Sequence, residues 1–135
     1  MAALAGGCLC GAVRYEVTAE PVRSSTCYCR DCQYASGGGP AHSLLVPRAG
    51  FAITKGAPRG YAKLSDSGNR ITRHFCADCG TPLLSDRAGG PFIAIRAGSL
   101  DDPAAYTPGG NIWARSAQAW HHIDPALPRW EKGPS

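Results

Sequence analysis

The sequence predicts a mostly β fold of short strands and loops that is stabilised by metal ligation. Glycine and proline are abundant, with 17 and 11 of the 135 residues, and this composition favours short strands and turns over long helices. Stretches of alternating polar and apolar residues recur between the turns. All seven cysteines fall into three short groups, which is the arrangement expected of metal ligands.

The first third of the chain predicts two strands and a helical turn. Residues 12–19 alternate between apolar and polar side chains, which is the pattern of a half-buried strand, and Pro21 follows them. Residues 22–26 can form a second strand. A short helical turn is expected at residues 31–35, just before a run of glycines.

The later strands are separated by turns rich in glycine, proline, asparagine and aspartate. We expect these strands at residues 42–46, 51–54, 60–64, 70–75, 92–97 and 111–113. Residues 86–91 are expected to turn, and residues 98–103 to form a turn or a single helical turn capped by an aspartate. Arg73 shares a strand face with Ile71 and Phe75, and the sequence explains it only as a snorkelling or partnered side chain.

Length, charge and the N-terminal residues predict a single domain, residues 1–135, located in the cytoplasm. The basic residues are scattered and the formal net charge is only +4, so no nucleic-acid partner is expected. Residues 1–7 lack the charged start and long apolar stretch of a signal peptide, and no segment is apolar enough to cross a membrane. A reducing compartment would leave the cysteines free to bind metal.

Two of the cysteine groups are metal hooks that lie far apart in the sequence. Cys8 and Cys10 form a C-x-C hook, and Cys76 and Cys79 form a C-x-x-C hook. A glycine follows each hook and relieves a tight turn. Four thiolates complete the tetrahedral shell of a structural zinc ion. The first and middle strands are therefore expected to lie adjacent, pinned by this zinc.

The third group is a triplet, Cys27, Cys29 and Cys32, within a single short loop. Three ligands from one loop cover only one side of an ion, and three protein ligands with an open fourth position are typical of catalytic zinc. The sequence therefore predicts two zinc ions per chain, of which the second can be partly occupied.

Three alternatives to this assignment remain open. The cysteines could form disulfides, although their number is odd and no secretion signal is present. The segment from Cys29 to Cys32 could be a thioredoxin-like redox pair, although the chain lacks a βαβ pattern. The triplet could hold a second structural zinc with a histidine as fourth ligand. The histidines available for that role are His42, His74, His121 and His122.

Several residues near the triplet are candidates for assisting a reaction there. Arg30 could offset the negative charge of three thiolates. The backbone amides of Gly37 and Gly38, together with Gly39, could receive a developing oxyanion. The alternative interpretation of these glycines is a flexible turn.

Aromatic residues are concentrated in the C-terminal part of the chain. Trp113, Trp120 and Trp130 are expected to anchor a meandering tail on the core, or alternatively to form an aromatic wall over the open metal site. His121 and His122 are the first candidates for an added ligand or an acid–base group.

The order and content of these motifs resemble the glutathione-dependent formaldehyde-activating enzyme family. The matching segments are G-G-C-L-C-G-A-V-R-Y-E-V at residues 6–17, C-Y-C-R-D-C-Q-Y-A-S-G at 27–37, R-H-F-C-A-D-C-G-T-P-L at 73–83, G-S-L-D-D-P at 98–103 and N-I-W-A-R-S-A-Q-A-W at 111–120. They include all seven cysteines and span nearly the whole chain.

The resemblance implies a β-tent fold of antiparallel sheets. It implies a structural zinc on Cys8, Cys10, Cys76 and Cys79, and a catalytic zinc with an open position on Cys27, Cys29 and Cys32. Members of the family are classed as carbon–sulfur lyases, and the reaction that names it joins glutathione and formaldehyde. The expected function is therefore that of a zinc-dependent carbon–sulfur lyase-type enzyme acting on a small thiol and an aldehyde. The alternative is a non-catalytic, zinc-stabilised binding or chaperone-like module, since fold alone does not fix function.

Overall fold

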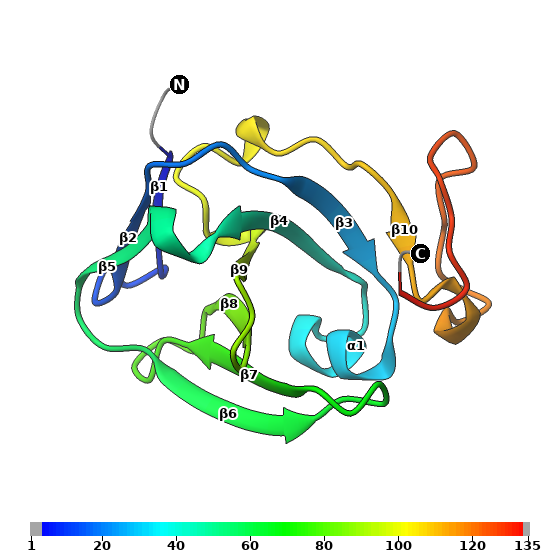
Figure 1. The fold of residues 1–135 in the computed structure, drawn as a ribbon, viewed down its shortest axis with the longest axis horizontal. Coiled ribbons are helices and arrows are strands. Elements are labelled where there is room, and N and C mark those ends of the chain that lie inside the picture. Colours follow the sequence, from blue (N-terminus) through cyan, green and yellow to red (C-terminus); the bar gives the residue numbers. More distant parts are fainter. Residues whose placement is uncertain (1–3, 134–135) are drawn as a thin grey trace.

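The computed structural model describes residues 4–133, which form two β-sheets and one short α-helix (Figure 1). The elements are β1 (Leu4–Gly7), β2 (Arg14–Val17), β3 (Arg23–Cys27), α1 (Arg30–Ser36), β4 (Ala41–Pro47), β5 (Phe51–Lys55), β6 (Arg59–Leu64), β7 (Arg70–Phe75), β8 (Pro82–Arg87), β9 (Phe92–Arg96) and β10 (Asn111–Ile112). Short 3₁₀ turns lie at Arg48–Gly50, Ala97–Ser99, Pro103–Ala105 and Ala114–Ser116. The prediction of a mostly β fold is confirmed.

The two sheets differ in size. The small sheet has the order β1-β2-β5, and the large sheet has the order β10-β3-β4-β9-β8-β7-β6. All neighbouring strands are antiparallel except β10, which runs parallel to β3. In Figure 1 the large sheet curves from β3 and β4 round to β7 and β6, and α1 lies between these two ends.

The hydrophobic core joins the small sheet to one face of the large sheet. Tyr15 and Val17 are fully buried while Glu16 between them is exposed, so the alternation seen in the sequence does set the inward face of β2. The partners of these residues on the large sheet are Leu44, Val46, Leu83, Leu84, Ile93 and Ile95. Inside this core the Tyr15 hydroxyl and Ser99 Oγ are 2.7 Å apart and hydrogen-bonded.

One expectation about local structure was wrong. Residues 86–91 do not form one turn, because β8 continues to Arg87 and Asp86 is paired with both neighbouring strands. The sequence also gave no sign of β1, whose pairing depends on glycine. A Cβ on Gly6 would lie 2.3 Å from the Ser99 carbonyl oxygen, so only glycine permits this close approach. The pairing of Asp86 with β7 and β9, and the close approach of Ser99 to Gly6, are tertiary effects that local sequence patterns do not predict.

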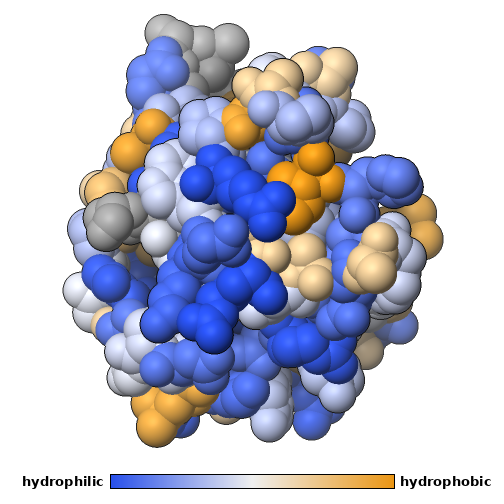
Figure 2. Space-filling model, turned by 90° about the vertical axis from the view of Figure 1, so that its right-hand side faces the viewer, coloured by the Kyte–Doolittle hydropathy of each residue, from blue (hydrophilic) through white to orange (hydrophobic). Residues whose placement is uncertain are grey.

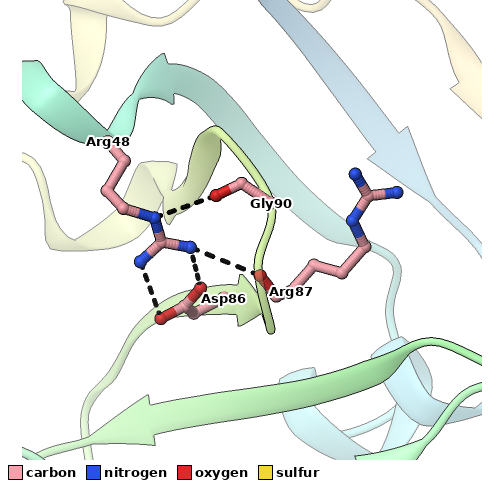
Figure 3. A network of polar contacts seen from close by, with 4 residues as sticks. All are labelled: Arg48, Asp86, Arg87 and Gly90. Carbon is pink, nitrogen blue, oxygen red and sulfur yellow. Dashed lines mark hydrogen bonds and ion pairs between the residues drawn. The ribbon is translucent and has the colours of Figure 1, made fainter.

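A polar network fastens the corner after β4 to the end of β8 (Figure 3). The Arg48 guanidinium pairs with the Asp86 carboxylate through two hydrogen bonds. Its Nε also donates to the Gly90 carbonyl at 2.9 Å, and one Nη donates to the Arg87 carbonyl at 3.3 Å. Only the backbone of Arg87 takes part, and its own side chain points away from the network in Figure 3.

We expect the Asp86→Asn substitution to destabilise the protein near neutral pH and to have less effect in acid. The hydrogen bonds from Arg48 hold the pKa of Asp86 below its ordinary value. A carboxylate with a lowered folded-state pKa contributes stability above its unfolded pKa of about 4 and loses it as the pH falls through the folded value. The expected loss near neutral pH is about 1 kcal/mol in the free energy of unfolding.

Urea unfolding of the wild type and the variant at several pH values measures this difference. The difference in the free energy of unfolding between the wild type and the variant is compared at each pH, because protonation of the cysteines affects both proteins alike. Asp66→Asn, in the exposed β6–β7 loop, is the control and should leave stability unchanged. A loss for Asp86→Asn that is equally large in acid would contradict the assignment of this ion pair.

Candidate metal centres

The two cysteine hooks meet in space although 66 residues separate Cys10 from Cys76. The sulfur atoms of Cys8, Cys10, Cys76 and Cys79 all lie within 4.8 Å of one another. The Sγ–Sγ distances are 3.6 Å between Cys8 and Cys10 and 3.7 Å between Cys10 and Cys76. A tetrahedral ion with bonds of about 2.3 Å places its sulfur ligands about 3.8 Å apart. The donor set and its spacing therefore suit a zinc ion.

The backbone around this four-cysteine cluster supports ionised sulfur. Gly11 and Gly80, which follow the hooks, have φ angles of +81° and +78°, a region that favours glycine. The Val13 amide donates to Cys8 Sγ at 3.2 Å, and the amide of Cys79 donates to Cys76 Sγ at 3.4 Å. Such N–H groups stabilise a thiolate.

The Cys79 sulfur is also favoured as a thiolate. A hydrogen bond with the Thr81 side chain is the main cause that lowers the pKa of Cys79 to about 5, and a hydrogen bond with the Thr81 backbone is the next. The hydroxyl lies 3.1 Å from the sulfur. The same hydroxyl oxygen accepts a hydrogen bond from the Leu9 amide, so one side chain links the two hooks.

The prediction that the first and middle strands lie side by side was wrong in one respect. The hooks do meet, but β2 belongs to the small sheet and β7 to the large one, so these strands do not pair. Cys8 and Cys76 are buried in the core between the sheets, whereas Cys10 and Cys79 are exposed. The four-cysteine cluster therefore ties the small sheet to the large sheet at the surface.

The cysteine triplet is assembled by the end of one strand and the start of the helix. Cys27 ends β3, Cys29 is the N-cap of α1, and Cys32 lies in its first turn. The Cys29 sulfur accepts a hydrogen bond from the Cys32 amide at 3.3 Å. The three sulfurs lie within 4.8 Å of one another. Each of the two cysteine clusters could therefore hold a metal ion.

Within residues 4–133, the ligand atoms gathered at the triplet come from these cysteines alone, without histidine, aspartate or glutamate. His42 lies instead beside Thr26, with its Nδ1 3.3 Å from the threonine Oγ1. His74 lines a cavity next to β6 and β7, and His122 is exposed.

His121 has a structural role that the sequence did not reveal. Its Nδ1 accepts a hydrogen bond from the Gln118 amide at 2.8 Å, so the proton of the neutral ring is on Nε2. Nε2 lies 2.8 Å from the Gly38 carbonyl and donates to it. Both ring nitrogens are thus engaged, and they fasten the C-terminal segment to the glycine turn.

The glycines after α1 form the helix cap. The amides of Gly37 and Gly38 both donate to the Gln33 carbonyl, and both residues have positive φ angles of +79° and +118°. The amides of Gly37 and Gly38 are therefore engaged in the helix cap and are not free to receive an oxyanion at the triplet.

One face of the large sheet carries several arginines and serines and lines a cavity of about 380 Å³ beside the triplet. Register and the two-residue repeat place alternate residues of five strands on this face. They are Arg23, Ser25 and Cys27 of β3, Ser43 and Leu45 of β4, Ala94 and Arg96 of β9, Ser85 of β8, and Ile71 and Arg73 of β7. The opposite face carries the core. The unexplained position of Arg73 in the sequence follows from this, since its strand face borders a cavity and not the core.

Two arginines from this wall act on the triplet. Hydrogen bonds from Cys27 and Cys29 are the main causes that lower the pKa of Cys32 to about 3, and the charges of Arg96 and Arg73 add to the effect. The pKa of Cys27 is raised, because its thiol hydrogen-bonds to both other sulfurs. The three thiols therefore titrate as one coupled group, in which nearby positive charge favours ionised sulfur.

Arg30, the cation that the sequence suggested, is engaged elsewhere. It lines the cavity, but one Nη donates to Gln33 Oε1 at 2.5 Å and its guanidinium lies over the Tyr34 ring at 4.7 Å. Gln33 is itself fully buried and donates to the carbonyls of Tyr28 and Ser116. Gln33 therefore joins the triplet loop to the C-terminal segment. In the sequence, only its position directly after Cys32 could have suggested this role.

The three tryptophans separate into two roles. Trp113 packs against the triplet, lines the cavity and has a φ of +56°, a strained conformation for a bulky residue. Trp130 packs against Gly110, and Trp120 is 64% exposed beside His121. Both expectations therefore hold in part, with Trp113 as the wall and Trp130 as an anchor.

The face that carries the C-terminal segment is mostly hydrophilic, and Figure 2 shows its hydrophobic patches as small and separated. In the part of the chain that the structure describes, no helix has the length and apolar character to span a membrane.

Comparisons with known proteins address the fold and the family of this chain. A crystal structure of a Rhodobacter sphaeroides protein has a similar fold, with a TM-score of 0.60 and 18% identity over 93% of this chain and 99% of that one. A Halomonas elongata protein, provisionally described as a glutathione-dependent formaldehyde-activating enzyme, is 33% identical over 84 residues. That match covers 59% of this chain and only 54% of the relative. The family model for the glutathione-dependent formaldehyde-activating enzyme matches residues 3–116. The chain therefore belongs to the glutathione-dependent formaldehyde-activating enzyme family.

Proposed function

We propose that residues 1–135 form one catalytic domain, a zinc-dependent enzyme of the carbon–sulfur lyase type that acts on a small thiol and an aldehyde. The observation that carries this proposal is a triplet of thiols that borders a cavity and, within residues 4–133, has no fourth protein ligand. Family membership supports the same chemistry, and glutathione and formaldehyde are the substrates that the family name suggests.

The residues present suit two zinc ions. Cys8, Cys10, Cys76 and Cys79 would hold a structural ion, and the triplet would hold a second ion with one position left for substrate. Thiolate ligands select a soft divalent metal such as zinc. When bound at the triplet, zinc would supply a positive centre that favours the ionised form of an incoming thiol.

The residues around the triplet favour a negatively charged adduct. Three thiolates and a divalent ion carry a net single negative charge, and an incoming thiolate raises this to two. Arg73 and Arg96 lie close enough to act on the charge of Cys32 and together supply two positive charges. The site with a thiolate substrate is then balanced, which lowers the cost of burying it.

In the proposed reaction the thiol loses its proton to solvent and its sulfur attacks the carbonyl carbon of the aldehyde. The π electrons of the carbonyl move to oxygen, which takes a proton from solvent, and a hydroxyalkyl thioether results. The reverse reaction breaks the same carbon–sulfur bond, which is lyase chemistry. Gln33 and Trp113 hold the triplet loop in place during either direction.

Titration of the cobalt(II)-substituted protein with glutathione tests this proposal. We expect the thiolate-to-cobalt absorption to change with saturation as the thiol binds at the triplet. A matched titration with S-methylglutathione, which has no free thiol, should leave the spectrum unchanged. An unchanged spectrum with glutathione and with smaller thiols would contradict the proposal and favour a non-catalytic binding module.

A further inference from the structure

Arg73 carries a buried polar atom without a partner. Among the side chains of residues 4–133, its Nε is the buried nitrogen or oxygen atom that has no hydrogen-bond partner. A buried donor that is left unpaired costs about 1–3 kcal/mol, and more when the group is charged. A buried polar atom of this kind needs an explanation, and strain, a functional role, or an ordered water or ion bound beside it are the usual ones.

Arg96 stands beside Arg73 and also lacks a carboxylate. Burial is the main cause that lowers the pKa of Arg96, and the charge of Arg73 lowers it further. Its one side-chain hydrogen bond among the described residues goes from Nη1 to Ser43 Oγ at 2.5 Å. The ion pairs within residues 4–133 involve neither arginine, and the nearby Asp31 is paired with Lys63 at 2.6 Å.

The two arginines lie where two cavities adjoin. The cavity beside the triplet and a second cavity of about 460 Å³ share four lining residues, Asp31, Lys63, Arg73 and Arg96. The second cavity is more apolar and is bordered by Tyr34, Tyr61, Phe75, Pro82 and Leu84. Arg73 and Arg96 therefore border both the cavity beside the triplet and the second cavity.

We propose that Arg73 and Arg96 form an anion site that binds a carboxylate of the thiol substrate. This inference rests on the proposed function and narrows its substrate class to thiols that carry a carboxylate a short distance from the sulfur. A guanidinium presents a planar fork of donors that matches a carboxylate, and among residues 4–133 neither Arg73 nor Arg96 is paired with one. The Asp31–Lys63 ion pair borders the site and adds no net charge to it.

Two small thiols test the inference on the cobalt(II)-substituted protein. Mercaptoacetate has a carboxylate where mercaptoethanol has a hydroxyl group, and their affinities follow from the thiolate-to-cobalt absorption. We expect the preference for mercaptoacetate to fall by about 10- to 100-fold in Arg73→Gln, the range for losing hydrogen bonds to a charged group. The ratio of the two affinities is compared between proteins, because the thiols differ in acidity.

Arg70→Gln is the matched control. Arg70 lies on the same strand but three residues away, on the opposite face, and is exposed. This variant loses the same charge and should keep the wild-type preference. Arg73→Lys keeps the charge without the fork and is used if Arg73→Gln does not fold; its preference should fall as well. An equal preference in the wild type and the Arg73 variants would overturn the inference.

Acetate separates this inference from the proposed function, because it contains no sulfur. On the zinc-loaded protein it should raise the midpoint of thermal unfolding for the wild type and Arg70→Gln but not for Arg73→Gln. If neither thiol changes the cobalt spectrum but acetate behaves in this way, the proposed function fails and the anion site stands. If both thiols bind but acetate stabilises all proteins equally or none, the arginines only balance the thiolates and the inference fails.

Discussion

Cys10→Ser is expected to lose one metal ion and with it the cooperative folding of the chain. The Cys10 side chain is exposed, so a serine there would normally change stability by no more than about 0.5 kcal/mol. As a zinc ligand, however, Cys10 closes the link between the two sheets. Structural zinc contributes about 10–16 kcal/mol in small zinc domains, which is comparable to the whole stability of about 5–15 kcal/mol.

Circular dichroism during thermal unfolding and metal analysis measure this effect together. Leu9→Ser is the control, because Leu9 lies between the hook cysteines and is 91% exposed. That variant should keep its metal and its unfolding transition. A Cys10→Ser protein that unfolds cooperatively at the wild-type temperature would show that the four-cysteine cluster does not hold the fold together.

Cys29→Ser is expected to abolish thiol binding and lyase activity while the protein stays folded. The substitution removes one ligand of the triplet, and the loss should exceed the roughly 10- to 100-fold that follows from losing a residue that only supports a ligand. Helix α1 should survive, because the Cys29 side chain caps it and serine is a preferred N-cap residue.

The cap gives this prediction a matched control. Cys29→Ala removes the ligand and the cap together, so it should be about 1 kcal/mol less stable than Cys29→Ser. Both variants should be equally inactive in an assay with glutathione and formaldehyde. In the cobalt titration, neither should show a change in the thiolate-to-cobalt absorption. A Cys29→Ser protein that still binds the thiol as tightly as the wild type would exclude the triplet as the substrate site.

The partition of the cysteines into four and three could be predicted because it depends on short spacings. A C-x-C or C-x-x-C hook fixes its own geometry, and three thiols within six residues cannot spread far apart. The strand at residues 70–75 was predicted with its correct bounds for a similar reason, since alternation is a local property.

The wall of the cavity could not be predicted, because a polar face on a strand usually points to solvent. Arg73, Ser85 and Arg96 become neighbours only through strand register and the curvature of the large sheet. Arg73 left a signal, since a charged residue interrupted an otherwise apolar face. No such indication exists in the sequence for Arg96, because it is the last residue of its strand and arginine is common at strand ends. In the same way, the glycines after α1 suggested free amides, and only the fold shows them bonded to Gln33.

The zinc content per chain of the freshly purified wild type and of Cys29→Ser decides whether the triplet binds a second metal ion. Two zinc ions are expected in the wild type and one in the variant, which should keep its cooperative unfolding transition. One zinc ion in both proteins would contradict this expectation, because the triplet would then hold no metal and its chemistry would be that of free thiols.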